Sequence, residues 1–93
     1  MKSSEITNFG HLAFKSGDFE SAVKYFSSLG NTSRDYWNGH LYLAMSYFYL
    51  GETNSAIQVL KDICDWCPNP VLREQALAAT RELHAFIYAS RRN

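Results

Sequence analysis

A short segment that occurs twice is the feature that most constrains the fold. Residues 17–23 read Gly-Asp-Phe-Glu-Ser-Ala-Val, and residues 51–57 read Gly-Glu-Thr-Asn-Ser-Ala-Ile, 34 positions later. Each copy lies between two stretches whose apolar residues recur at helical spacing. A fixed period of this length is typical of a helix–turn–helix unit that stacks into a solenoid. The sequence therefore predicts an all-α fold made of helical hairpins.

Three positions of the repeated segment have an expected structural role. Gly17 and Gly51 are expected to end a helix, because glycine enters the left-handed conformation without a steric penalty. Asp18 and Thr53 are candidates to cap the helix that follows. The alanine five residues after each glycine falls one turn into that helix. A small side chain there lets two antiparallel helices approach closely, as expected for a hairpin.

Apolar periodicity and turn signals along the whole chain predict five helices and no sheet. Ser3 or Ser4 is expected to cap the first helix and Asp35 the third. Asn69 followed by Pro70 is a start signal for the fifth. The expected helices cover about residues 3–16, 19–29, 35–50, 53–66 and 70–90.

Composition narrows the function classes. Lysine plus arginine balance aspartate plus glutamate at nine each, so neither nucleic-acid binding nor an acidic tail is favoured. The chain has no apolar run long enough to cross a membrane and no signal-peptide pattern. With two cysteines and no export signal, we expect a reducing, cytoplasmic location without membrane insertion.

The 34-residue units resemble the tetratricopeptide repeat, whose pattern is Trp-x2-Leu-Gly-x2-Tyr, then Ala-x3-Phe, then Pro. The second unit, starting at Trp37, matches this pattern at Leu43, Ala44, Tyr47, Ala56, Leu60 and Pro68. The first unit matches at Phe9, Gly10, Ala22 and Phe26. It departs from the pattern at Ala13 and Arg34, and in the second unit His40 replaces the tryptophan. The fifth helix matches only at Leu77 and Ala78.

The resemblance implies a right-handed superhelical stack of five helices in a single domain, residues 1–93. Repeat one would span about residues 3–36, repeat two about 37–70, and a C-terminal capping helix about 70–91. Two repeats are few, because each repeat needs a neighbour to bury its hydrophobic face. The fifth helix or a second copy of the protein must therefore cover the second repeat.

The resemblance also implies protein binding, since the first helix of each pair lines a concave groove in this family. Carrying those positions across gives the groove residues Asn8, His11, Phe14, Lys15, Leu41, Tyr42, Met45 and Tyr49. We expect the groove to bind an apolar peptide or an amphipathic helix, as an adaptor or assembly chaperone. One alternative is a structural homo-oligomer, such as a homodimer, that buries the same surface. Another alternative is that Tyr42 and Tyr49 only complete the core of the molecule.

A family subtype binds a terminal carboxylate with cationic residues, and this chain lacks them. The comparable positions hold Thr7, His11, Tyr42 and Met45, with no cationic pair. We therefore expect no carboxylate clamp.

No arrangement of residues predicts an enzyme, a metal site or a cofactor. Cys64 and Cys67 have redox or zinc-site spacing, but they close a helix instead of opening one. We expect Cys64 to be a small core residue and Cys67 a helix-end residue. The single histidines have no ligand spacing, and a solvated helix face explains Asp62 and Asp65. We expect no catalytic residues, no bound metal and no cofactor.

Overall fold

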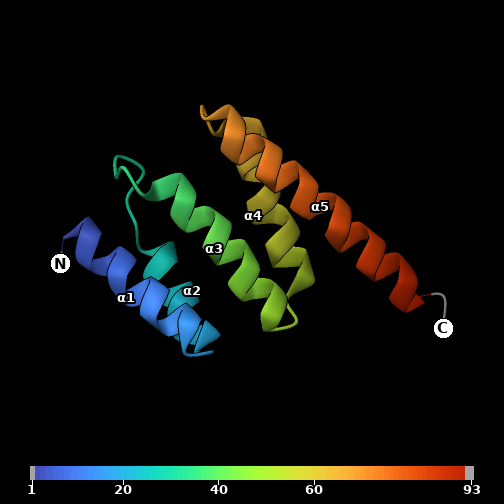
Figure 1. The fold of residues 1–93 in the computed structure, drawn as a ribbon, viewed down its shortest axis with the longest axis horizontal. Coiled ribbons are helices and arrows are strands. Elements are labelled where there is room, and N and C mark those ends of the chain that lie inside the picture. The colour runs from blue at the N-terminus through green and yellow to red at the C-terminus, as the bar shows by residue number, and fades with distance from the viewer. Residues whose placement is uncertain (1, 92–93) are drawn as a thin grey trace.

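The structure is a computed structural model, and it describes residues 2–91. These residues form five α-helices joined by short loops, without strands (Figure 1). Their bounds are α1 Ser3–Lys15, α2 Phe19–Ser27, α3 Tyr36–Tyr49, α4 Thr53–Trp66 and α5 Pro70–Arg91. The prediction of an all-α fold with five helices is confirmed.

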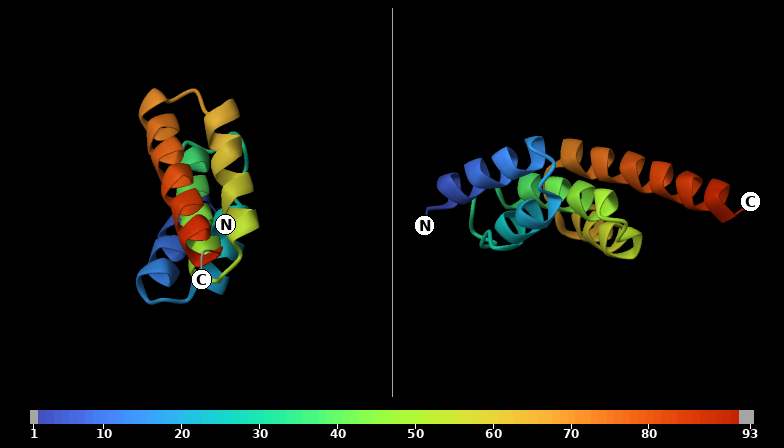
Figure 2. Two further views of the ribbon diagram at one scale, coloured as in Figure 1. Left: turned by 90° about the vertical axis from the view of Figure 1, so that its right-hand side faces the viewer. Right: turned by 90° about the horizontal axis from the view of Figure 1, so that it is seen from below.

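The helices pair as two hairpins followed by one long helix. α1 packs on α2, α3 packs on α4, and α2 and α3 join the hairpins, while α5 packs along α4. In the right-hand view of Figure 2, α1 and α5 lie on one side of the molecule, and α2 and α4 lie on the other. The molecule is elongated, 45 × 29 × 16 Å, and the C-terminal part of α5 extends beyond the turn between α3 and α4 (Figures 1 and 2).

The two copies of the repeated segment form the same turn. Gly17 and Gly51 both have φ of 82°, as the sequence predicts. In each turn the residue after the glycine donates its N–H to a carbonyl five residues earlier: Asp18 to Ala13 and Glu52 to Tyr47, both at 2.9 Å. This is the Schellman arrangement, which satisfies carbonyls that the end of a helix leaves without partners.

Two of the predicted helix caps are confirmed. The Asp18 carboxylate accepts a hydrogen bond from the Ser21 backbone N–H at 3.2 Å. Hydrogen bonding from the side chain and backbone of Ser21 lowers the pKa of this carboxyl group. The Asn69 side-chain oxygen accepts from the Val71 N–H at 2.9 Å, so Asn69 caps α5.

The other predicted caps are wrong, for two kinds of reason. Ser3 and Thr53 lie one residue too late, because the first intrahelical bonds are accepted by the carbonyls of Lys2 and Glu52. Ser4 lies further inside α1. Asp35 does occupy the N-cap position of α3, but its carboxylate makes no capping bond. It lies 3.1 Å from the Thr7 hydroxyl, whose single hydrogen is shared with the Ser3 carbonyl oxygen at 2.9 Å. Asp35 therefore ties α1 to the start of α3 instead of capping.

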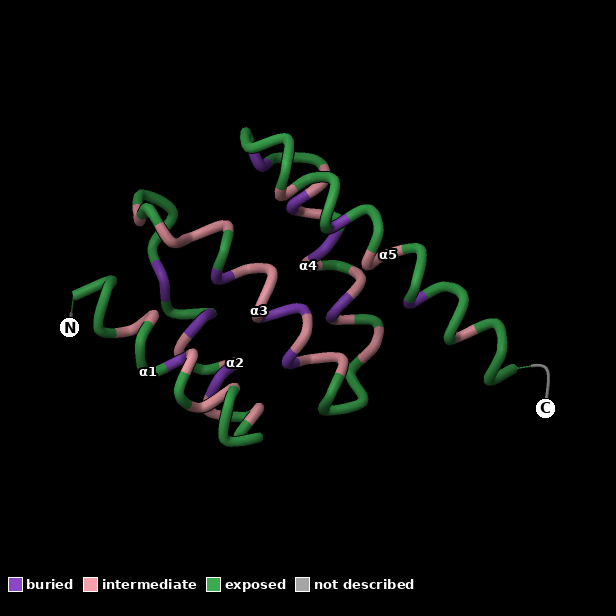
Figure 3. Tube along the Cα trace, in the orientation of Figure 1, coloured by how far each residue is buried: buried purple, intermediate pink, exposed green. Residues whose placement is uncertain are grey.

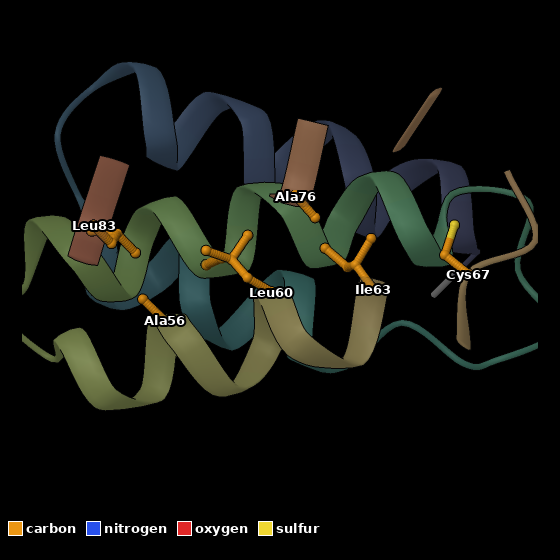
Figure 4. Packing of buried hydrophobic residues seen from close by; sticks show 7 residues of the cluster. Ala56, Leu60, Ile63, Cys67, Ala76 and Leu83 are labelled. Carbon is orange, nitrogen blue, oxygen red and sulfur yellow. The ribbon is translucent and has the colours of Figure 1, made fainter. Parts of the chain in front are cut away.

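The buried residues form two clusters, one centred on α2 and one on α4. The α2 cluster contains Ala22, Phe26, Leu29 and Leu43. The α4 cluster contains Ala44, Ala56, Leu60, Ile63, Cys67, Ala76 and Leu83, drawn close up in Figure 4. The repeated alanines are fully buried, as their small size in a hairpin predicts. Figure 3 shows that exposed residues dominate the C-terminal part of α5.

Cys67 is the C-cap residue of α4, as predicted, but the structure buries it more deeply than Cys64, the residue expected in the core. Cys67 is 2% exposed, whereas Cys64 is only half-buried. The chain turns back after Trp66 to begin α5, and this turn carries Cys67 into the α4 cluster. The Arg73 guanidinium, one turn into α5, donates to the Cys67 carbonyl at 2.9 Å.

Candidate functional site

The eight residues that the sequence predicts for the groove separate into three groups. Leu41, Met45 and Tyr49 of α3 line an open groove against α5, and the Tyr49 ring also stacks on Phe19 of α2 and contacts Phe14. His11, Phe14 and Tyr42 contact other aromatic rings where α1, α2 and α3 meet. Asn8 and Lys15 are exposed on α1 and do not line the groove.

The rings form a compact group, here called the aromatic cluster: His11, Phe14, Phe26 and Tyr42. Tyr42 is at its centre, with ring centroids 4.4 Å from His11, 5.3 Å from Phe14 and 5.6 Å from Phe26. The first two contacts are edge-to-face and the third is stacked, which are the favourable geometries for aromatic pairs. Phe26 is fully buried. The aromatic cluster therefore holds the first hairpin against α3.

An open hollow between α3 and α5 is here called the α3–α5 groove. It has a volume of about 380 Å³, within the range of ligand-binding pockets. Its walls come from α3 and α5, and Leu60 contributes from α4. Figure 1 shows α4 behind the space between α3 and α5. The lining residues are Leu41, Ala44, Met45, Phe48, Tyr49, Leu60, Gln75, Ala79, Glu82, Leu83 and Phe86.

The small residues of α5 explain why the groove stays open. Ala76 is fully buried against α4, and Ala79 lines the groove. Short side chains let α5 approach α4 closely but do not fill the space toward α3. At the far end the groove is bridged by Phe48 and Phe86, whose rings make an edge-to-face contact at 5.4 Å. Tyr49 and Phe86 remain 59% and 54% exposed.

One charged side chain lines the groove. Glu82 and Gln75 belong to α5, and the other lining residues are apolar or aromatic. Within residues 2–91, Glu82 forms no ion pair, since the ion pair found there joins Lys61 and Asp65. The groove therefore combines an apolar surface with a single carboxylate.

The contribution of α5 is the part of the groove that the sequence expectation omits. Gln75, Ala79, Glu82, Leu83 and Phe86 all line it. The signal that could have found them is Phe86-Ile87-Tyr88, which is more apolar than a solvent-facing cap needs. The family motif misleads here, because Leu77 is 42% exposed while Ala76 and Leu83 are buried.

Other kinds of site are not formed by the described residues. Within residues 2–91, no three His, Cys, Asp or Glu side chains come together in a way that could hold a metal ion. None of the helices over the same range is long and apolar enough to cross a membrane.

The family model of the tetratricopeptide repeat matches residues 6–29 and 40–70, which is more than half of the chain. The chain belongs to the tetratricopeptide-repeat family. No curated protein and no solved structure matches the chain. The two matched tetratricopeptide repeats correspond to the hairpins α1–α2 and α3–α4, and α5 follows them. Tetratricopeptide repeats are protein-interaction units, so the protein is a protein–protein interaction module.

Proposed function

We propose that the α3–α5 groove binds an apolar peptide or an amphipathic helix of a partner protein. The observation that carries this proposal is that Tyr49 and Phe86, both on the groove, are more than half exposed. Large apolar side chains gathered on one open surface typically mark an interaction site. Burying them against a partner removes apolar area from water, at roughly 25 cal/mol for each Å².

The residue types suit a helical or extended apolar segment. Met45 is flexible and polarisable, so it adapts to the shape of the bound side chains. The rings of Tyr49 and Phe86 are anchors of the type that carries most of the energy of an interface. Glu82 favours a segment with a lysine or arginine beside its apolar residues. Such a module would act as an adaptor or an assembly chaperone.

We also propose that residues 1–93 form one interaction domain that acts in the cytoplasm. Cys64 and Cys67 are free thiols in the structure, which suits a reducing compartment.

Affinity capture with a blocked groove tests the binding proposal. The Met45→Glu variant places a second carboxylate in the apolar groove, and we expect the partner captured by the parent from an extract of its own cells to be lost. Asn54→Glu is the matched control, because Asn54 is exposed on α4 and does not line the groove. Thermal melts establish that both variants are folded. Equal capture by Met45→Glu and the parent would contradict the proposal.

Self-association is the second candidate function, favoured by the C-terminal part of α5. Phe86 and Tyr88 there are exposed, on a segment that extends beyond the second repeat (Figure 2). Sedimentation over a range of protein concentrations distinguishes the two functions. Partner binding predicts a monomer at all concentrations. A dimer that Phe86→Asp dissociates would instead support the homo-oligomer.

A further inference from the structure

A second open pocket lies at the other end of α3, away from the α3–α5 groove. We call it the tryptophan pocket, and its volume is about 410 Å³. It is formed by the loop before α3, the first turns of α3 and the last turns of α4. The residues that line it are Asn31, Tyr36, Trp37, His40, Asp62 and Trp66, and none of them lines the groove.

Aromatic rings make up most of the lining. The His40 ring lies 4.2 Å from Tyr36 and 5.2 Å from Trp37 between centroids, and Tyr36 and Trp37 contact each other edge-to-face at 5.0 Å. The His40 Nδ1 is 3.0 Å from the Tyr36 carbonyl oxygen. Since a carbonyl oxygen only accepts, Nδ1 carries the hydrogen, and this bond fixes the ring. Trp66 from α4 adds a large ring that is 74% exposed.

One carboxylate, that of Asp62, lines the tryptophan pocket. Asp62 lies on the last turns of α4, which has no basic residue in its final turn. A carboxylate at the C-terminal end of a helix is unfavourable, because the helix dipole is negative there. Asp62 accepts a hydrogen bond from the Gln58 amide at 3.3 Å, and within residues 2–91 it forms no ion pair. Asp65, in contrast, is paired with Lys61 at 3.8 Å.

We propose that the tryptophan pocket binds the charged end of a basic side chain, an arginine or a lysine, of a partner protein. Aromatic faces attract cations, tryptophan most strongly. The Asp62 carboxylate and the negative end of α4 act in the same direction. An arginine guanidinium fits best, because it stacks flat on aromatic rings and also donates hydrogen bonds to a carboxylate. A neutral ligand would leave the Asp62 charge without a counter-charge.

Tryptophan fluorescence reports this pocket alone, because Trp37 and Trp66 are the two tryptophans of the chain. The full chain is titrated with N-acetyl-arginine amide, N-acetyl-lysine amide and the uncharged N-acetyl-norleucine amide. We expect a saturable change with both cations at roughly millimolar concentration, tighter for arginine. We expect none with norleucine. Equal binding of the norleucine derivative, or no saturable change with either cation, would overturn the proposal.

Charge variants provide the second test. Asp62→Asn keeps the shape of the side chain and is expected to weaken arginine-amide binding at least tenfold. Asp65→Asn is the matched control on the same helix and is expected to bind like the parent, because Asp65 does not line the pocket. Equal losses for the two variants would overturn the proposal. Met45→Glu should leave this binding unchanged, so failure of the groove proposal and failure of this one are distinguishable.

Discussion

The packing of α3 toward the first hairpin differs from its packing toward α5. Toward the first hairpin, the half-buried Tyr42 ring is in contact with three rings from α1 and α2. On the side of α5, Met45 lines an open groove of about 380 Å³. Tyr42 and Met45 are three residues apart on one helix. Neighbouring positions on one face of α3 therefore serve cohesion toward the first hairpin and recognition toward α5.

The difference comes from what the neighbouring helices supply. α1 and α2 present His11, Phe14 and Phe26, whose rings fill the space beside α3. α5 presents Ala76 and Ala79, which allow close contact with α4 but leave space beside α3. A closed contact stabilises the fold, whereas an open one keeps apolar area available for a partner.

The largest expected difference in the free energy of unfolding is between Phe26→Ala, in the aromatic cluster, and Phe86→Ala, in the groove. Phe26→Ala removes a fully buried ring from the aromatic cluster, and we expect it to lower the free energy of unfolding by about 3–5 kcal/mol. Phe86→Ala removes a ring that is 54% exposed in the groove, and we expect less than about 1 kcal/mol. Urea unfolding of the two variants checks this pair. Similar losses for both would mean that the groove contact is as closed as the aromatic cluster.

An intermediate effect on the free energy of unfolding is expected when a larger side chain is introduced beside the first hairpin, at Gly39, or into the groove, at Ala79. A Cβ at Gly39 would lie 2.6 Å from Leu29 Cδ1, and Leu29 is buried. Overpacking typically costs about 1–3 kcal/mol, which the better helix propensity of alanine offsets by about 1 kcal/mol. We therefore expect Gly39→Ala to lower the urea midpoint.

Ala79→Leu adds more volume than Gly39→Ala, but it adds it to the open groove. We expect a change of less than about 1 kcal/mol in the free energy of unfolding, together with weaker partner binding, because the added side chain occupies the groove. An Ala79→Leu variant destabilised more than Gly39→Ala would show that the groove has no free space.

The smallest expected change in stability comes from replacing the N-cap residue that follows the glycine in each repeated segment. Asp18 caps α2, whereas Glu52 in the same place makes no side-chain cap bond. At neutral pH, Asp18→Ala should therefore lower the melting temperature slightly, and Glu52→Ala should change it less.

The Asp18 effect should also depend on pH in a definite direction. Because its pKa is lowered in the folded state, the stabilisation is complete above the ordinary pKa of about 3.9. It is lost as the pH falls through the lowered value. Melting curves of the parent and Asp18→Ala should therefore converge in strong acid. A constant difference at all pH values would show that the carboxylate charge is not involved.

The fold was largely predictable, because its signals are local. The glycine of each repeated segment and the apolar periodicity gave the helices to within a few residues. Caps were less predictable, since a carboxylate such as Asp35 can accept from a residue distant in sequence, here Thr7. The burial of Cys67 likewise depends on how the chain turns back into α5.

The candidate site was predictable only for α3. Helical spacing predicts Tyr42, Met45 and Tyr49 on one stripe; Met45 and Tyr49 line the groove, whereas Tyr42 packs in the aromatic cluster. The contribution of α5 could not be read from the motif, because the rotation of α5 on α4 is set by the buried Ala76 and Leu83. Gly39 also gave no signal, since its role is a close contact with Leu29 of the preceding hairpin.

The most direct test compares Met45→Ala with Tyr42→Ala in titrations of the captured partner, each beside a thermal melt. We predict that Met45→Ala weakens binding about tenfold or more, a loss of about 1.4 kcal/mol, with little change in melting temperature. Tyr42→Ala should melt earlier, yet bind with parental affinity at temperatures where it is folded. Folded Tyr42→Ala that binds as weakly as Met45→Ala, or Met45→Ala that binds like the parent, would contradict partner binding in the α3–α5 groove.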